Sequence, residues 1–249
     1  MKVFGSTDTG LVRSDNQDRF ACSMVSPKLA YAILCDGMGG EKGGSIAAEI
    51  AIQHAKEMLE RDLSEEMSEL TVRAILLSAI SGANALIYDM AQKQPELVGM
   101  GTTMIIAVAD GETLSISYVG DSRVYRVAEQ EDVQLTRDHT VVQMLVDIGE
   151  ITEEDARSHP QRHYITRAVG VAPSIEIEFL TDKMRPGDKV LLCSDGLYLY
   201  WGDAALNQLL ADCVRRGSAQ PLIDLANIGG GGDNVTAVVI ASEEVAANG

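Results

Sequence analysis

Residues 29–40 read Leu-Ala-Tyr-Ala-Ile-Leu-Cys-Asp-Gly-Met-Gly-Gly, an apolar run that leads into an Asp-Gly pair. A second apolar run, residues 190–196, reads Val-Leu-Leu-Cys-Ser-Asp-Gly. Both runs predict buried strands, but neither Asp-Gly pair is followed by the returning strand that a hairpin needs. Asp36 and Asp195 are therefore candidates for chemistry rather than for turning the chain.

The sequence contains a control for this interpretation. Asp110-Gly111 lies between strand-like residues 103–109 and 113–118, and it fits an ordinary Asp-Gly hairpin. A third acid, Asp233, reverses the order, because it follows the glycine run 229–232 and precedes the apolar residues 235–240. Glycine beside a carboxylate lets backbone and ions approach closely.

Two pairs of helices are expected, one after Asp36 and one after Asp195. In the first helix an apolar stripe passes through His54, which we interpret as a packed core side chain. The second helix has a stripe of apolar residues with steps of three and four: Val72, Leu76, Ala79, Ala83, Leu86 and Met90. The later pair is expected over residues 203–215 and 220–226.

Strands are expected in blocks rather than in alternation with helices. The expected ranges are three short strands within 3–36, then 103–109, 113–119, 123–128, 133–136, 175–180, 189–193 and 235–240. This order favours an α+β fold over a doubly wound parallel sheet. Two antiparallel sheets covered by the helix pairs give a four-layer α-β-β-α sandwich. One domain over 1–242 is predicted, with a polar flap insertion at 138–170 that has Thr152 as a helix N-cap, and a disordered tail at 243–249.

The charge and the cysteines limit the possible partners. The 37 acidic and 20 basic residues give a formal net charge of −17, which argues against nucleic acid or an anionic membrane as the main partner. The four cysteines have neither disulfide nor metal-ligand spacing, which fits a reducing compartment. No signal-peptide core and no run of ~20 apolar residues is found, so a cytoplasmic location is expected.

Several aspartates fall at expected strand ends or loop starts. They are Asp18, Asp36, Asp121, Asp195 and Asp233. Mg²⁺ and Mn²⁺ prefer such oxygen ligands, and two ions held about 4 Å apart can activate a water and clamp a phosphate. A single Asp beside Gly is usually a turn residue, and the spacing alone does not name a reaction.

Six segments, in order, carry a resemblance to a known family. They are 8–18 (DTGLVRSDNQD), 36–40 (DGMGG), 99–103 (GMGTT), 119–123 (VGDSR), 194–197 (SDGL) and 232–236 (GDNVT). In these segments the chain resembles the bacterial branch of the type 2C (PPM) serine/threonine protein phosphatases, from about residue 2 to residue 241. The resemblance implies hydrolysis of phosphoserine and phosphothreonine on proteins by direct attack of a metal-bridging hydroxide.

The resemblance also implies roles for matching residues. Asp36 is expected to bridge two catalytic metals, with the Gly37 carbonyl on one of them and Asp195 and Asp233 on the other. Asp121 with Asp195 resembles a third, weaker metal site. Arg13 is similar to the family's phosphate-binding arginine, and Asp18 to an acid that orients metal-bound water. The implied cofactors are Mg²⁺ or Mn²⁺, and the implied partners are substrates of a serine/threonine kinase.

The chain departs from the family pattern at several positions, and two of them bear directly on the chemistry. Gln17 replaces a common Glu, which removes one negative charge beside a metal, and Glu41 replaces a common His, which leaves the general acid open. Two alternatives therefore accompany the phosphatase interpretation. One is a weakly active or inactive regulatory partner that binds phosphoproteins, and the other is a phosphoesterase for small molecules.

Overall fold

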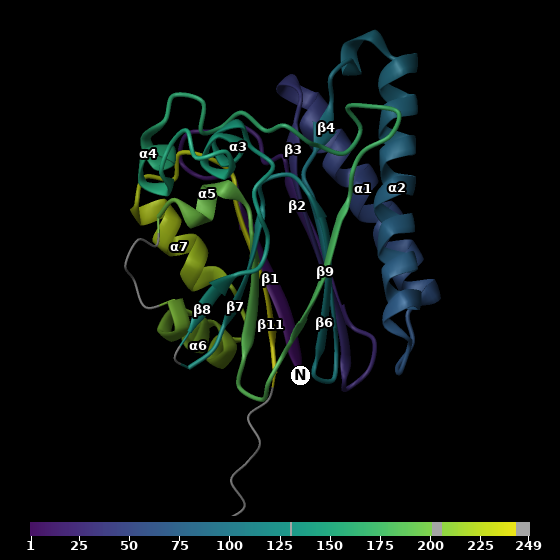
Figure 1. The fold of residues 1–249 in the computed structure, drawn as a ribbon, viewed down its shortest axis with the longest axis vertical. Helices are drawn as coiled ribbons and strands as arrows, with labels where there is room; N and C mark the ends of the chain where they lie inside the picture. The colour runs from purple at the N-terminus through teal and green to yellow at the C-terminus, as the bar shows by residue number, and fades with distance from the viewer. Residues whose placement is uncertain (130, 201–205, 243–249) are drawn as a thin grey trace, which may run out of the picture.

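The core consists of two antiparallel β-sheets packed face to face (Figure 1). The computed structural model describes residues 1–129, 131–200 and 206–242. The first sheet has the order β1 (Lys2–Asp8), β11 (Val235–Ala241), β10 (Lys189–Cys193), β7 (Arg123–Val127), β8 (Asp132–Gln134). The second has the order β2 (Asp18–Met24), β3 (Leu29–Met38), β5 (Met104–Asp110), β6 (Thr113–Val119), β9 (Glu178–Lys183), and β4 (Gly101–Thr102) pairs with β3.

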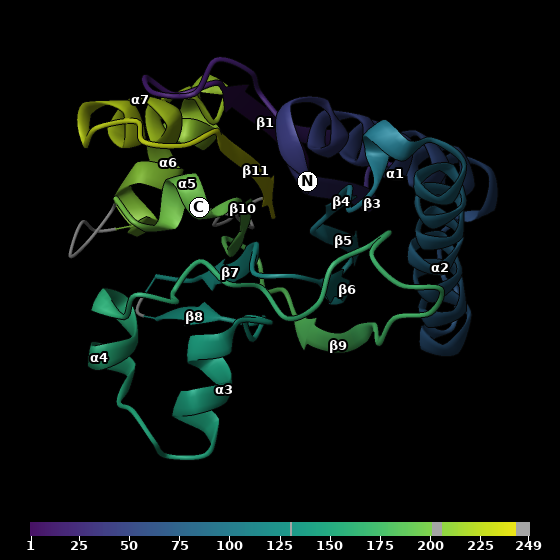
Figure 2. The same cartoon turned by 90° about the horizontal axis from the view of Figure 1, so that it is seen from above.

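Helices cover the outer faces of both sheets, which confirms the predicted four-layer α-β-β-α sandwich (Figures 1 and 2). The second sheet is covered by α1 (Gly40–Asp62) and α2 (Glu69–Lys93), and the first by α6 (Leu206–Arg216) and α7 (Gln220–Ile228). The shorter elements are η1 (Pro95–Leu97), α3 (Val141–Asp147), α4 (Glu153–Ser158) and α5 (Asp195–Tyr198). Apolar side chains fill all three interfaces between the four layers.

Strand β3 continues to Met38, beyond residue 36, where the range expected for the first three strands ends. Its pairing with β5 stops at Leu34, but Asp36 still faces Asp18 on β2, and Gly37 pairs with Thr102 on β4. Asp36 therefore lies inside a strand at the point where the strand changes partners. Strand β9 also differs from the prediction, since it begins at Glu178 rather than at residue 175.

The control hairpin at Asp110-Gly111 is confirmed, because Asp110 pairs with Thr113 and Gly111 has a φ of 58°. The next connection was not predicted. Strands β6 and β7 belong to different sheets, and the chain crosses between them at Gly120 with a φ of 115°. A Cβ on Gly120 would lie 2.6 Å from the Thr103 side chain, so glycine is required there.

Helix α2 buries a slightly different stripe from the predicted one. Leu86 is exposed and Ile87 is buried in its place, because a straight helix of 3.6 residues per turn drifts away from a strict alternation of threes and fours. By length and mean hydropathy, 1.6, α2 is also the one described helix that could cross a membrane. Its buried face packs against α1 and the second sheet, as in the core helix of a globular domain.

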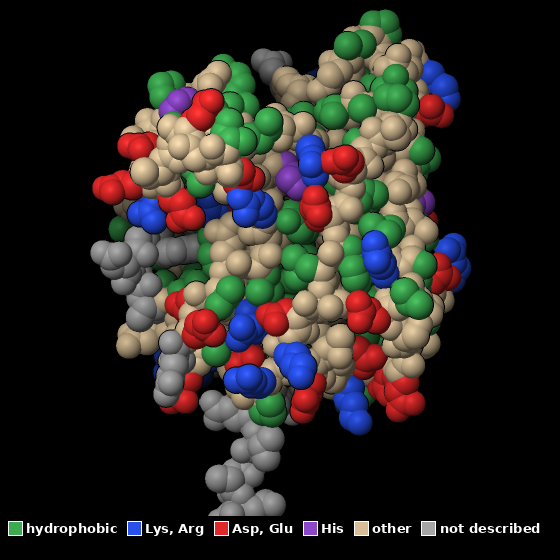
Figure 3. Space-filling model, in the orientation of Figure 1, with side chains coloured by type: hydrophobic (Ala, Val, Ile, Leu, Met, Phe, Trp, Pro, Cys, Tyr) green, Lys and Arg blue, Asp and Glu red, His purple; other side chains and the backbone are tan. Residues whose placement is uncertain are grey.

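The predicted flap contains two short helices, α3 and α4. Thr152 is confirmed as the N-cap of α4, where its hydroxyl accepts from the Asp155 amide in a capping box. The first residues of the helix expected at 203–215 and the predicted tail 243–249 lie outside the described residues. The four cysteines are free, as expected. On the face drawn in Figure 3, acidic and basic side chains are interspersed, and basic ones form no continuous patch.

Candidate metal centre

The predicted acidic residues come from both sheets and meet at one end of the sandwich, the upper end in Figure 1. Asp18 and Asp36 face each other across β2 and β3. Asp195 begins α5, directly after β10, and Asp233 lies two residues before β11. Asp121 lies on the crossing between β6 and β7. The electrostatic influence of the other four on Asp36 shows that the structure brings the set together.

Asp36 has the most perturbed carboxyl group of this set. Its backbone is fixed by Thr103, whose hydroxyl accepts from the Asp36 amide at 3.0 Å and whose amide donates to the Asp36 carbonyl at 2.8 Å. Burial raises the pKa of Asp36 well above its ordinary value, and the surrounding carboxylates act in the same direction. Without a cation, negative charge on Asp36 is therefore disfavoured.

Asp18 is almost fully buried. One carboxylate oxygen, Oδ2, accepts from the Ser194 hydroxyl at 2.7 Å, whereas Oδ1 has no partner among the described atoms. Burial raises the pKa of Asp18 to about 6, although hydrogen bonds from Ser194 and Thr236 oppose the rise. A buried carboxylate oxygen without a donor is suited to a cation or to water that a cation holds.

Asp195 and Asp121 share this electrostatic environment. Burial, followed by the charges of Asp121 and Asp233, raises the pKa of Asp195 to about 8. Burial and the nearby Asp138 raise the pKa of Asp121 to about 6. Crowded carboxylates that resist ionisation are typical of sites that bind cations or share protons.

Arg13 brings a positive charge that acts on Asp195, and it reaches the centre from the loop between β1 and β2. Its Nη2 lies 2.7 Å from Oδ2 of Asp233, and hydrogen bonding to Asp233 raises the pKa of Arg13. The Arg13 side chain remains 57% exposed, so its guanidinium is accessible to a ligand arriving from solvent.

Close backbone contacts shape the side of the centre that Gly37, Gly44 and Gln17 form. A Cβ on Gly37 would lie 2.2 Å from the Gly44 carbonyl oxygen, and one on Gly44 would lie 2.3 Å from Oε1 of Gln17. The Gln17 side chain donates from Nε2 to the Gly40 carbonyl at 3.0 Å. Gln17 is therefore packed among the glycines that follow Asp36. Glu41 lies in the first turn of α1, and nothing is described of its side chain.

Asn234 joins the two ends of the site, although no pattern in the sequence singled it out. Its Oδ1 accepts from the Gln17 amide at 2.8 Å, and its Nδ2 donates to the carbonyls of Thr9 and Asp15. Its position directly after Asp233 in a quoted segment was a signal, but a bond to residues more than 200 positions away is not readable from spacing.

These residues fit hard divalent cations by the chemistry of their donors. The centre offers buried carboxylate oxygens, an unpartnered Asp18 Oδ1, and a Gly37 backbone that only glycine allows so close to its neighbours. Within the described residues, no three acidic, His or Cys side chains are already arranged to hold an ion. Donor chemistry and burial therefore support the site, and the individual ligand assignments stay predictions.

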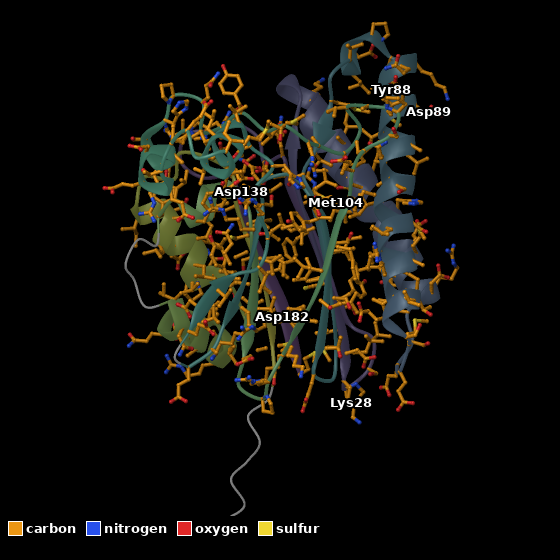
Figure 4. All side chains as sticks on the ribbon, in the orientation of Figure 1. Lys28, Tyr88, Asp89, Met104, Asp138 and Asp182 are labelled. Atoms are coloured by element: carbon orange, nitrogen blue, oxygen red, sulfur yellow. The ribbon has the colours of Figure 1, made fainter. Side chains whose placement is uncertain are left out.

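A large cavity adjoins the centre under the flap. Its volume is about 960 Å³, and it is lined by Asp195, Tyr198 and flap residues including Arg162 and His163. Arg123 lies 3.6 Å over the Tyr198 ring and pairs with Asp138, which Figure 4 places at the flap end of the molecule. The second ion pair on β7, between Arg126 and Asp182, lies farther from the centre (Figure 4).

His139, at the start of the flap, has a structural role. Its Nδ1 accepts from the Gly120 amide at 3.0 Å, and its ring stacks on Tyr118. The other flap histidine, His159, accepts locally from the Gln161 amide. His54 is likewise packed rather than chelating, since its Nε2 is buried against Gly82.

Comparisons with known proteins match nearly the whole chain to a single protein family. The family model described as protein phosphatase 2C matches residues 12–226. The serine/threonine phosphatase stp of Listeria innocua is 34% identical over 238 residues, which cover 94% of this chain and 93% of that protein. The serine/threonine protein phosphatase PstP of Mycobacterium tuberculosis is 38% identical over 239 residues, 96% of this chain but 44% of that protein.

Solved structures agree with the sequence relatives. The M. tuberculosis phosphatase PstP/Ppp superposes with a TM-score of 0.83 at 37% identity, covering 98% of this chain and 99% of that one. Stp1 from Staphylococcus aureus gives 0.88 at 32% identity, covering 97% and 94%. The catalytic domain of PstP in complex with two manganese ions gives 0.80 at 35% identity, covering 96% of each chain.

Proposed function

The chain belongs to the protein phosphatase 2C family, and from this premise we propose how its own residues carry out the reaction. It is a metal-dependent enzyme that hydrolyses phosphoserine and phosphothreonine on proteins. The observation that supports the proposed site is the crowded group of carboxylates around Asp36. The pKa of Asp36 is raised well above its ordinary value by burial and by these neighbours.

Asp36 is the proposed bridging ligand, with the Gly37 carbonyl beside it and Asp195 and Asp233 on the far side. Two divalent cations, when bound, supply an activated water and neutralise the charge of the phosphate. Cations of this kind favour ionised carboxylates, and so they offset the repulsion that otherwise raises the pKa of Asp36 and of Asp195. Asp18 would orient water held by the metals. It would do so through Oδ1, since Oδ2 already accepts from the Ser194 hydroxyl.

Arg13 is the proposed phosphate-binding residue. Its planar group of donors matches the oxygens of a phosphate, and more than half of the side chain is exposed. Its present partner, Asp233, is also a proposed metal ligand. Arg13 would therefore exchange the Asp233 carboxylate for the phosphate of the substrate, and a cation held by Asp233 would leave both charges paired.

The finer assignments rest on the same group of residues. Mg²⁺ or Mn²⁺ is the proposed cofactor, and two manganese ions occur in the structure of the PstP catalytic domain. Asp121 with Asp195 is the proposed third, weaker site, and their mutual repulsion supports it. We further propose that the substrates are those of a serine/threonine kinase and that the enzyme acts in the cytoplasm without binding nucleic acid or membrane, which the charge of −17 supports.

Hydrolysis of p-nitrophenyl phosphate and of a phosphothreonine peptide tests this function. Both should be cleaved with Mn²⁺ and not with EDTA, and Asp36→Asn should abolish turnover because it removes the proposed bridging charge. Asp110→Asn is the matched control, since Asp110 belongs to the ordinary hairpin and should leave activity intact. Full activity of Asp36→Asn would overturn the assignment.

A further inference from the structure

Three large apolar side chains are exposed on the loop that carries Arg13 and at the end of the neighbouring helix α7. Leu11 and Val12, directly before Arg13 in the loop after β1, are 69% and 71% exposed, and Ile228 at the end of α7 is 86% exposed. Figure 2 shows the purple loop after β1 lying next to the yellow α7. We call Leu11, Val12 and Ile228 the apolar shelf.

The backbone that carries the apolar shelf is firmly anchored. The Asp8 carboxylate Oδ1 accepts from the Gly10 amide at 2.9 Å and from Nδ2 of Asn227 at 3.2 Å, which ties the loop to the helix residue next to Ile228. The Leu11 amide donates to the Gly231 carbonyl at 2.7 Å. The shelf is therefore held in place on two segments that are far apart in sequence.

Gly10 shows how little freedom this loop has. Its φ is 78°, and a Cβ there would lie 2.2 Å from the Asp233 carbonyl oxygen. The close approach of Gly10 to Asp233 thus helps to set the position of the residues that follow in the loop. These are Leu11 and Val12, and then Arg13, which pairs with the Asp233 side chain. Exposed apolar side chains that adjoin a site and are held rigidly indicate an interaction surface.

The substrate is the occupant that the position favours. The phosphorylated residue must bring its phosphate to Arg13, and an extended chain advances about 3.3 Å per residue. Residues one or two positions away from the phosphorylated residue therefore reach Leu11 and Val12. An acidic neighbour would meet a chain of net charge −17, whereas an apolar one would cover the shelf.

We propose that the apolar shelf of Leu11, Val12 and Ile228 is a specificity subsite, which binds an apolar side chain next to the phosphoserine or phosphothreonine of the substrate protein. This inference rests on the proposed function and adds a substrate preference to it. When the apolar neighbour covers the shelf, the apolar surface of both is removed from water, which strengthens binding. A hydrophobic pocket selects between side chains in the same way.

Phosphothreonine peptides test the proposal with the full chain and Mn²⁺. Leu, Ser or Glu is placed at each of the two positions on either side of the phosphothreonine. At one or more of these positions, kcat/KM for the Leu peptide should exceed that for the Ser peptide by on the order of tenfold, with the Glu peptide lowest. Equal values for all three residues at every position would overturn the proposal.

Variants assign the preference to the shelf. In Leu11→Ser with Val12→Ser, and separately in Ile228→Ser, the ratio of kcat/KM between Leu and Ser peptides should fall toward one. The ratio is measured within each variant, so a change in total activity does not affect it. The near-isosteric Val12→Thr reports the same loss with minimal change in shape.

Leu70→Ser is the matched control, since Leu70 is 75% exposed near the start of α2 and should keep the parent ratio. Shelf variants that retain the parent ratio would show that the preference arises elsewhere and would refute the proposal. Failure of the parent to cleave p-nitrophenyl phosphate with Mn²⁺ would instead contradict the proposed function, so the two failures are distinguishable.

Discussion

At the scale of single residues, the centre is governed by how much negative charge it can hold. Buried and half-buried carboxylates are crowded together around Asp36, and Arg13 pairs with the more exposed Asp233 at their edge. Gln17 places a neutral amide where the family resemblance of the sequence leads us to expect an acid. Whether this position carries a neutral amide or a charged carboxylate therefore affects how tightly the proposed cations bind.

Gln17→Glu should tighten Mn²⁺ binding on the order of tenfold, because a carboxylate binds a hard cation more strongly than an amide does. Isothermal titration calorimetry measures the change. Gln53→Glu is the control, since it adds the same charge on the exposed side of α1. An unchanged Mn²⁺ affinity in Gln17→Glu would contradict a place for Gln17 beside the metals.

His139 gives the protein a pH dependence in the acid range. Burial, and then the Arg167 charge, lower the pKa of His139 below its ordinary value, although Glu178, Asp138 and Glu176 oppose the shift. The folded protein thus favours the neutral ring, which accepts from the Gly120 amide. This stabilisation is present above the unfolded pKa of about 6.5 and is lost as the pH falls through the lower folded value.

Thermal unfolding between about pH 7.5 and about pH 5 tests this linkage. The stability of the parent should fall relative to that of His139→Asn as the pH decreases, because the Asn Oδ1 can accept from the Gly120 amide at either pH. Parallel curves for the two proteins would show that His139 does not titrate against folding.

The charged residues of the centre were easier to recognise in the sequence than the residues that fix their positions by hydrogen bonds. Asp36 and Asp195 were recognisable because each Asp-Gly pair failed to make a hairpin where Asp110-Gly111 does. The supporting bonds of Asn234, Ser194 and Thr103 connect segments that are distant in sequence. Such bonds depend on the tertiary fold, which no local pattern contains.

At the scale of elements, helix α2 is linked to the return of the flap by one buried amide. The Asn84 Oδ1 accepts from the Gly170 amide at 2.7 Å, and its Nδ2 donates to the Ala172 carbonyl at 3.0 Å. A Cβ on Gly170 would lie 2.1 Å from the Ile87 side chain, one turn further along α2. The helix thus fixes where the flap rejoins the second sheet.

Asn84→Ala should lower the free energy of unfolding by about 1–3 kcal/mol, because it leaves the buried Gly170 amide without an acceptor. Urea denaturation measures the change. Gln53→Ala is the control, since it removes an exposed amide from a helix and should cost less than about 0.5 kcal/mol. A loss in Asn84→Ala no larger than that of the control would show that the link contributes little.

Elements with strong local patterns were predicted well, and those set by long-range pairing were not. Strand β10 has the predicted bounds, Lys189–Cys193, and the Thr152 cap forms as expected. The crossing after β6 contains a glycine and an aspartate, as a hairpin would. The sequence therefore does not distinguish a crossing between sheets from a hairpin within one sheet. The start of β9 is likewise set by its pairing with β6 rather than by its own residues.

At the scale of the whole molecule, the proposed cations bind between the two sheets and so stabilise the complete sandwich. Binding to the folded state alone adds about 2.7 kcal/mol when Mn²⁺ is at 100 times its dissociation constant. For a chain of this size, the midpoint of thermal unfolding should rise by roughly 5–10 °C over the value in EDTA. Calorimetry of the parent measures this shift.

Asp195→Asn should lose most of the Mn²⁺-dependent shift, because it removes a proposed ligand at the start of α5. Asp110→Asn should keep it. A Mn²⁺ shift in Asp195→Asn equal to that of the parent would place the stabilising ions elsewhere on the molecule.

The order of pairing in the first sheet has a consequence for how the enzyme is made. Strand β1 has β11 as its only strand partner among the described residues, and Arg13 meets Asp233 across a separation of 220 residues. Ribosomes deliver β1 long before β11. A nascent chain therefore carries no complete centre until Asp233 and β11 have emerged from the ribosome, and before that point it has no phosphatase site with which to act on the cell's phosphoproteins.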